Sequence, residues 1–206
     1  MSTASEWFRP ASPRVPADDP FTHRARGAAP ALLGPLVAPG ATRAFPARWL
    51  GDEPGTVLTV AVPGLEDGEA HLQVMLHRPR LTGCWETEAL LVDHSDLRGP
   101  DVLVADVAPG SEGRAADLAV RWLAGQLSRP VREERWVGWR GTIASRLVMA
   151  DTGSVLLERG GRVIRRHGEP AQVLQVRPCA ADRAPSGDRA PSAGRRPAAG
   201  RTPERA

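Results

Sequence analysis

Apolar and polar side chains alternate along several short stretches, and a period of two residues predicts β-strands. The clearest stretch is 71–77, where Leu72, Val74 and Leu76 would point into a core and the residues between them outward. Comparable patterns occupy 56–62, 85–94, 101–107, 131–139, 142–150, 154–159, 162–166 and 172–176. The breaks between these stretches are short and rich in Gly, Pro, Asp or Ser, which favours hairpins over helical crossovers.

One stretch, residues 111–130, has the period of a helix instead. Its apolar stripe consists of Ala115, Leu118, Ala119, Trp122 and Leu123. Ser111 is placed to cap the first turn, and Pro130 is placed to end the helix. We expect Trp122 to anchor this helix on a sheet.

These elements predict an α+β fold: an antiparallel β-sheet of about eight strands, four before and four after one long amphipathic helix that packs on it. Residues 47–178 would form this single α+β domain. Residues 1–46 contain eight prolines and few aliphatic side chains, which favours a disordered or draped N-terminal arm. Residues 179–206 are rich in Arg, Pro and Ala and lack large apolar side chains, so we expect a disordered tail.

The net positive charge suggests nucleic-acid binding, but its distribution along the sequence argues against a basic folded domain. The net charge is +3, and all 27 basic residues are arginine. Residues 180–206 carry six arginines and three acidic residues, so the whole excess belongs to the tail. Of the rest, residues 1–120 carry 10 arginines against 16 acids, and 121–179 carry 11 against 5. Either the second half presents a basic face to an anion, or strands of both halves are neighbours in one sheet and their opposite charges compensate each other.

The stretch 148–157, VMADTGSVLL, resembles the catalytic loop of aspartic proteases at Asp151-Thr152-Gly153-Ser154. Those enzymes need two carboxylates that share a proton, one from each lobe or subunit. This chain has one such loop, and too few residues follow it to build a flap and a second apolar turn. A hairpin turn explains the stretch, since Gly153 supplies a positive φ and Asp151 favours a turn. We therefore interpret it as a turn.

Other candidates for chemistry are His77, Cys84, Asp93 and His94. A small hydrolase would have to bring these side chains within hydrogen-bond reach of one another. Asp93 and His94 are adjacent on an expected strand and would point opposite ways. The two cysteines of the chain, Cys84 and Cys179, are too few for a zinc site. We expect no metal site and no cofactor.

The strongest candidate for binding is the segment 129–141, RPVREERWVGWRG, with four arginines and two tryptophans. Such arginines contact phosphates and such tryptophans stack on bases in nucleic-acid-binding proteins. The alternative is that tryptophan packs inward while arginine pairs with Glu133 and Glu134. The candidate binding residues are Arg129, Arg132, Arg135, Trp136, Trp139 and Arg140.

The N-terminus has no apolar core typical of a signal peptide, and no stretch of about 18 apolar residues occurs. We therefore expect a cytoplasmic protein that does not contact membranes. Our preferred hypothesis is a non-catalytic protein-interaction or regulatory module with flexible arms, which binds a protein partner or a second copy of itself. The alternative is an accessory nucleic-acid-binding protein that uses residues 129–140 and the basic tail. A small hydrolase ranks third.

Overall fold

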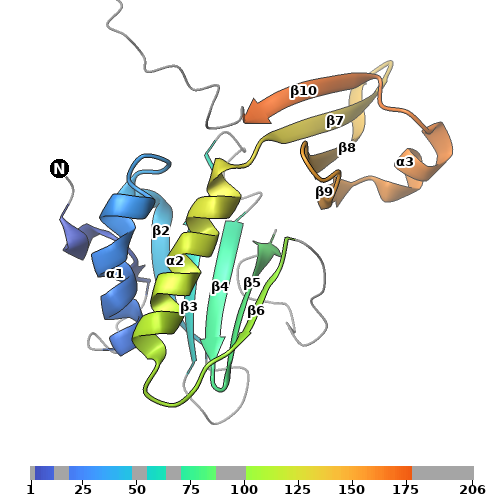
Figure 1. The fold of residues 1–206 in the computed structure, drawn as a ribbon. Helices are drawn as coiled ribbons and strands as arrows, with labels where there is room; N and C mark the ends of the chain where they lie inside the picture. The colour runs from blue at the N-terminus through green and yellow to red at the C-terminus, as the bar shows by residue number, and fades with distance from the viewer. Residues whose placement is uncertain (1–2, 12–18, 48–54, 64–70, 87–100, 178–206) are drawn as a thin grey trace, which may run out of the picture.

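A computed structural model of the protein describes residues 3–11, 19–47, 55–63, 71–86 and 101–177 (Figure 1). It contains ten β-strands in two sheets. The larger sheet has six strands, which are β1 (Arg9–Pro10), β2 (Thr42–Ala47), β3 (Gly55–Ala61), β4 (His71–His77), β5 (Arg80–Glu86) and β6 (Leu103–Asp106). Their order in the sheet follows their order in the sequence. The β1–β2 pair is parallel, and the other four pairs are antiparallel.

Two long helices, α1 (Pro20–Leu32) and α2 (Glu112–Ser128), pack side by side on one face of the six-stranded sheet (Figure 1). Two short 3₁₀ turns, η1 (Ala4–Glu6) and η2 (Pro39–Ala41), precede the first helix and β2. The cross-strand row of Ala44, Leu58, Val74, Gly83 and Leu103 belongs to the face that the helices cover. This face and the helices enclose the main apolar core of the described residues.

Trp122 of α2 packs directly over Gly83 of β5, as the sequence analysis expected of an anchoring tryptophan. A Cβ atom added to Gly83 would lie 3.1 Å from the Trp122 ring and 3.1 Å from Leu103 Cβ. A glycine is therefore needed there for close packing of helix and sheet. The helix itself agrees with the prediction, since it begins after Ser111 and ends at Ser128, two residues before Pro130. Ser111 does not cap it, because its hydroxyl donates to the Ala108 carbonyl at 2.5 Å.

The smaller sheet has four antiparallel strands in the order β10-β7-β8-β9. These strands are β7 (Val131–Gly138), β8 (Gly141–Met149), β9 (Val155–Arg159) and β10 (Gln172–Arg177). A short helix, α3 (Gly161–His167), connects β9 to β10 and packs against β7 and β8. In Figure 1 this sheet extends from the end of α2, to one side of the six-stranded sheet.

The prediction of mixed helix and antiparallel sheet is confirmed, but its details differ. One sheet was expected, whereas the described residues form two, with ten strands and three α-helices instead of about eight and one. The two halves of the chain therefore do not share a sheet, and their opposite charges are not compensated in the way proposed. The stretch 162–166 was expected to be a strand and lies in α3. Gly160 and Gly168, with φ of 74° and 68°, flank this helix and allow the chain to enter and leave it.

The expectation for residues 1–46 is corrected, because this segment supplies α1, β1 and most of β2. Trp7, Phe8, Phe21 and Leu33 are 1% exposed or less and belong to the main core. Phe8 has a left-handed φ of 45°. That backbone is held on both sides, since the Phe8 N–H donates to Thr42 Oγ1 at 2.8 Å and Arg26 donates to the Phe8 carbonyl at 3.2 Å.

Three of the described prolines of this segment, Pro20, Pro30 and Pro46, occupy positions that tolerate them. Pro20 is the first residue of α1, where its missing N–H would have no helical partner. Pro30 lies in the last turn, where it removes one helical hydrogen bond. The backbone nitrogen of Pro46 in β2 points to the same edge of the strand as the Ala44 carbonyl, which accepts a hydrogen bond from the Ala11 N–H. Among the described residues, pairing with β1 on that side ends at Ala44. A high proline count therefore did not prevent folding.

Two further expectations fall partly outside the described residues. The stretch 85–94 overlaps β5 only at residues 85 and 86, and residues 87–100 are not described. The tail 179–206 also lies outside the described residues. None of the described helices is long and apolar enough to cross a membrane.

Candidate functional site

The six candidate binding residues do not form one surface. Arg129 follows α2, Arg132, Arg135 and Trp136 lie on β7, and Trp139 and Arg140 form the turn between β7 and β8. The first four take part in internal contacts, and the last two are exposed to solvent.

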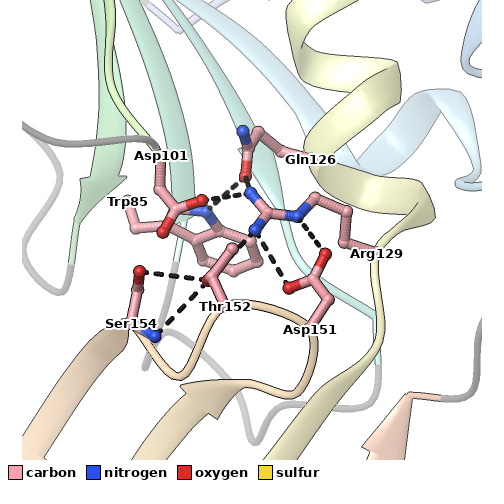
Figure 2. A network of polar contacts seen from close by, with 7 residues as sticks. All are labelled: Trp85, Asp101, Gln126, Arg129, Asp151, Thr152 and Ser154. Carbon is pink, nitrogen blue, oxygen red and sulfur yellow. Dashed lines mark hydrogen bonds and ion pairs between the residues drawn. The ribbon is translucent and has the colours of Figure 1, made fainter.

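Arg129 joins three parts of the chain at the junction between the two sheets (Figure 2). Its Nε donates to Asp151 Oδ2 at 2.8 Å, and its Nη2 donates to Asp151 Oδ1 at 3.0 Å. Its Nη1 donates to Asp101 and to Gln126 Oε1, the latter at 3.1 Å. Only 20% of the Arg129 side chain is exposed. The guanidinium is therefore fully engaged and is not a site for an external phosphate.

The same junction explains the aspartic-protease-like stretch. Residues 150–154 form the turn between β8 and β9, as predicted, and Gly153 has a φ of 74°. The Gly153 N–H donates to the Met149 carbonyl at 2.8 Å. The hydrogen bond from Arg129 lowers the pKa of Asp151 below its ordinary value. This carboxylate is thus held ionised by an arginine, whereas an aspartic protease needs a carboxyl that shares a proton with another.

Trp85 also reaches this junction from β5. Its indole Nε1 donates to Gln126 Oε1 at 3.1 Å, so that oxygen accepts from both Trp85 and Arg129. The Trp85 ring also packs against the small apolar cluster of Val131, Leu147 and Met149 in the four-stranded sheet. Trp85, Gln126 and Arg129 therefore connect the two sheets.

Arg132 and Arg135 lie on opposite faces of β7, and each pairs with a glutamate of the same strand. Arg132 Nη2 lies 2.8 Å from Glu134 Oε1, and Arg135 Nη2 lies 2.6 Å from Glu133 Oε2. Glu134 is 3% exposed and also accepts from Arg146 Nε at 2.5 Å. This arrangement is the arginine–glutamate pairing that the sequence left open as the alternative to a basic binding face.

Trp136 is buried, at 3% exposure, in a second small cluster with Ala144 and Ile164 of α3. Its indole Nε1 donates to the Gly168 carbonyl at 3.0 Å, which fixes the end of α3 against β7. The guanidinium of Arg146 lies 5.4 Å from the ring centroid. Trp136 therefore holds the short helix on the sheet and is not available to a partner.

Trp139 and Arg140 remain as the exposed pair. Trp139 is 88% exposed, and the Arg140 guanidinium stacks over its ring at 4.1 Å from the centroid. Val137 and Ile143, within three residues of the turn, are 42% and 45% exposed. We call Val137, Trp139, Arg140 and Ile143 the hairpin tip. The sequence analysis missed Val137 and Ile143, although they flank the two glycines that bound the turn.

The arginines of α3 were also missed. Arg162, Arg165 and Arg166 are exposed, while Val163 and Ile164 face the sheet. A Cβ added to Gly160 would lie 3.1 Å from the Ile143 carbonyl, so α3 begins beside the hairpin tip. The pair Val163 and Ile164, between two glycines, was the available sequence signal for this short helix. Seven residues are too few to show a helical period, so the signal was not recognised.

His77 and Cys84 do not converge. Cys84 of β5 is paired with Gln73 of β4, four residues from His77 along the strand, which corresponds to about 13 Å. Asp93 and His94 lie outside the described residues. Burial lowers the pKa of His71, so this imidazole is neutral at pH 7. Within the described residues, no three His, Cys, Asp or Glu side chains lie close enough together to hold a metal ion.

A groove of about 510 Å³ lies between β6 and the first half of α2. Its apolar lining includes Leu81, Val107 and Leu118, and Arg114 and Arg121 stand on the helix beside them. Asp117 also lines it and is already bound by Arg24 of α1, with Nε and Oδ1 2.8 Å apart. The lining contains no His or Cys. The groove is a small hollow with a mixed lining, and the hydroxyl of its one serine, Ser111, donates to the Ala108 carbonyl and not to a base.

The fold and the site together define a mixed α/β protein with two sheets, and among the described residues its most exposed aromatic side chain lies at a hairpin tip. No family model, no curated protein and no solved structure matches the chain.

Proposed function

We propose that the protein is a non-catalytic protein-interaction module that contacts a protein partner through the hairpin tip. The observation that supports this most strongly is the 88% exposure of Trp139. The other aromatic side chains among the described residues are buried or half-buried. While Trp139 is exposed, the fold lacks the roughly 1.5 to 3 kcal/mol of stability that burial of a large apolar side chain contributes.

The surroundings of Trp139 fit a protein contact. Val137 and Ile143 extend the apolar surface on either side of the turn, and Arg140 adds a charge beside the ring. Tryptophan and arginine are the residue types most enriched among those that dominate protein–protein binding energies. The junction around Arg129 gives the four-stranded sheet a fixed base, and the tip is presented at its far end.

A second candidate, an accessory nucleic-acid-binding protein, is favoured by the arginines of α3. Arg162, Arg165 and Arg166 are exposed beside a tip on which a base could stack. Against it, Arg129, Arg132 and Arg135 are engaged by carboxylates within the protein. The interface for nucleic acid would therefore be limited to Arg140, Trp139 and α3, without the rest of β7.

The decisive experiment places a photo-crosslinking amino acid at position 139 and, as a matched control, at Val155. Val155 is 49% exposed and lies on β9 of the same sheet, away from the tip. In cells that naturally express the protein, we expect position 139 to give discrete protein adducts that position 155 does not. Identical adduct patterns at both positions would contradict the proposal.

Nucleic acid is tested in parallel by fluorescence anisotropy with mixed-sequence DNA and RNA at several salt concentrations. The full chain is compared with its Trp139→Ala variant and with a chain ending at Arg177. Binding that survives removal of the tail, weakens steeply with salt and is lost in Trp139→Ala would favour the second candidate. Binding that disappears with the tail reflects nonspecific arginine charge.

A further inference from the structure

The two sheets have four edges, and three of them are protected against pairing with another strand. β1 has only two residues and ends in Pro10. β6 has four residues and ends in Asp106. β9 contacts β5 of the other sheet and ends in Glu158 and Arg159. Short length, proline, charge and coverage are the usual ways in which proteins protect sheet edges.

The fourth edge, β10, is the longest of the four and contains no proline. It is six residues long, and its first five residues, Gln172 to Val176, are uncharged. Val173 and Leu174 point to opposite faces of the sheet and are 57% and 40% exposed. In the sheet order β10 is the terminal strand and pairs only with β7. Figure 1 shows it as the outer strand of the four-stranded sheet.

We propose that β10 is a dimer interface, at which it pairs antiparallel with β10 of a second copy of this chain. The two four-stranded sheets would then form one continuous sheet of eight strands across a two-fold axis. A symmetric dimer is closed, because the β10 edge of each copy is then paired with that of the other, and no further copy is added at this edge. This inference goes beyond the proposed function and does not depend on the hairpin tip.

A second copy suits this strand because its sequence is compatible with itself. With the two-fold axis at Leu174, that residue lies opposite its own counterpart. Val173 then lies opposite Gln175 of the other copy. A bulge lies between Gln175 and Arg177, so regular pairing about this axis spans Val173 to Gln175. Like charges directly opposite each other destabilise an antiparallel pair, and this register contains none.

The neighbouring strand adds no repulsion either. In the cross-strand row of Leu174 the next residue is Glu133 of β7, followed by Leu147 and Leu157. Glu133 is neutralised by Arg135, with Oε2 and Nη2 2.6 Å apart. The two copies of Glu133 would be three strand spacings apart, about 14 Å. The cross-strand row that contains Leu174 is thus apolar except for one compensated charge.

The first test measures association of the full chain by sedimentation velocity between about 1 and 100 μM, a range suited to a small interface. We expect a reversible monomer–dimer equilibrium. Leu174→Lys places two like charges across the axis and should weaken dimerisation at least tenfold. Val155→Lys, at the other edge of the same sheet, should leave it unchanged. Trp139→Ala should also leave it unchanged, which separates this inference from the proposed function.

Four outcomes would overturn the proposal: a monomer throughout the range, a dimer unaffected by Leu174→Lys, equal weakening by Val155→Lys, or growth beyond the dimer. Circular dichroism of each variant checks that it folds. Because Leu174 is 40% exposed at an edge, the lysine has access to water and should not unfold the sheet.

The second test determines the register by disulfide formation in a chain that carries Cys179→Ser. Cys84 stays in place, because it is buried. Leu174→Cys should give a disulfide-linked dimer under mild oxidation, since directly opposite residues are close enough to bridge. Val173→Cys alone should not, whereas the double variant Val173→Cys/Gln175→Cys should. Cross-linking by Val173→Cys but not by Leu174→Cys would contradict pairing about Leu174.

Discussion

Arg129 and Asp151 form a two-point ion pair across the junction of the two sheets, with Nε–Oδ2 and Nη2–Oδ1 distances of 2.8 and 3.0 Å. The pair links the residue that follows α2 to the turn between β8 and β9. Arg129 also binds Asp101, which directly precedes the strand region of β6. The orientation of the four-stranded sheet therefore depends in part on this arginine, which is 20% exposed, together with the packing of Trp85.

Replacement of this arginine should loosen the junction. We expect Arg129→Ala to lower the free energy of unfolding by about 2 to 4 kcal/mol, because it leaves Asp101 and Gln126 without their shared donor. Urea denaturation measures the loss, and hydrogen exchange should accelerate in the β8–β9 turn. Arg121→Ala is the control, since Arg121 is exposed on the same helix and should cost less than about 0.5 kcal/mol. Equal costs for the two variants would contradict the role assigned to Arg129.

The same pair should make stability depend on pH in acid. Since Arg129 lowers the pKa of Asp151 in the folded state, the ionised carboxylate contributes stability that is complete above the unfolded pKa of about 4. That contribution is lost as the pH falls through the lower folded pKa. Asp151→Asn should be less stable than the wild type at pH 7, and the difference should shrink below pH of about 4.

Urea midpoints of both proteins between pH 7 and pH 3 provide the measurement. Because 41% of the Asp151 side chain is exposed, added salt should also reduce the difference at pH 7. A difference that stays constant over this pH range would show that Asp151 stabilises the turn by something other than its charge.

The two tryptophans of the candidate segment should behave oppositely. Trp136→Ala removes a buried ring and its hydrogen bond to Gly168, and should cost about 3 to 5 kcal/mol. Trp139→Ala removes an exposed ring and a stacked arginine, and should cost less than about 1 kcal/mol. Guanidinium denaturation of both variants tests this. A large cost for Trp139→Ala would mean that the ring packs within the protein and is not offered to a partner.

Two glycines with the same backbone angle offer a matched comparison. Gly153 and Gly160 both have a φ of 74°. A Cβ at Gly153 meets nothing within 4 Å, whereas a Cβ at Gly160 would lie 2.9 Å from Ala144 Cβ. Gly153→Ala should therefore cost about 1 kcal/mol for the left-handed backbone alone. Gly160→Ala should cost at least about 1 kcal/mol more, measured by thermal or urea denaturation. Similar costs would show that α3 moves away from β8 easily.

The start of α1 is stabilised by a single carboxylate. Asp19 Oδ2 accepts from the Thr22 N–H at 2.9 Å, from Thr22 Oγ1 at 2.6 Å and from Thr56 Oγ1 at 3.2 Å. Asp19→Ala should lower the free energy of unfolding by about 1 to 2 kcal/mol. Ser111→Ala, at the corresponding position of α2, should cost about 0.5 kcal/mol or less, because its hydroxyl does not cap that helix. The reverse order of costs would contradict these cap assignments.

The sequence predicted β3, β4 and β6 of the six-stranded sheet, but not β1, β2 or most of β5. The alternation of Leu72, Val74 and Leu76 corresponds to the helix-facing side of β4, and all three are 5% exposed or less. The outward half of this prediction is wrong, because Gln73 and Met75 are also buried, at 2% and 5% exposure.

The division into two sheets was not predictable from alternation. Alternation indicates which side chains share a face of a strand, but not which other strands it pairs with. Among the described residues, the sheets are connected by the contacts of Arg129 and Trp85 and by contacts between β5 and β9. Side chains that meet across such a distance in sequence leave no local pattern.

The N-terminal segment was misjudged for a different reason. A high proline count predicted a disordered or draped arm. Whether a proline is compatible with a helix or strand depends instead on its position relative to the backbone hydrogen bonds. Asp19 followed by Pro20 is a helix-start signal, and it was present in the sequence. The arginine–glutamate pairs of β7 were foreseen as an alternative because adjacent charges on alternating strand positions find partners two residues away.

The position of α1 at the start of the chain has a consequence for synthesis. This helix packs chiefly against α2, which begins 80 residues after α1 ends at Leu32. At about 5 to 20 residues per second, the ribosome needs on the order of 4 to 16 s to supply that interval. Phe21, Ala25 and Ala29, which are fully buried in the finished protein, have no helical neighbour during this time. The nascent chain therefore exposes its first apolar surface to chaperones well before its main core can close.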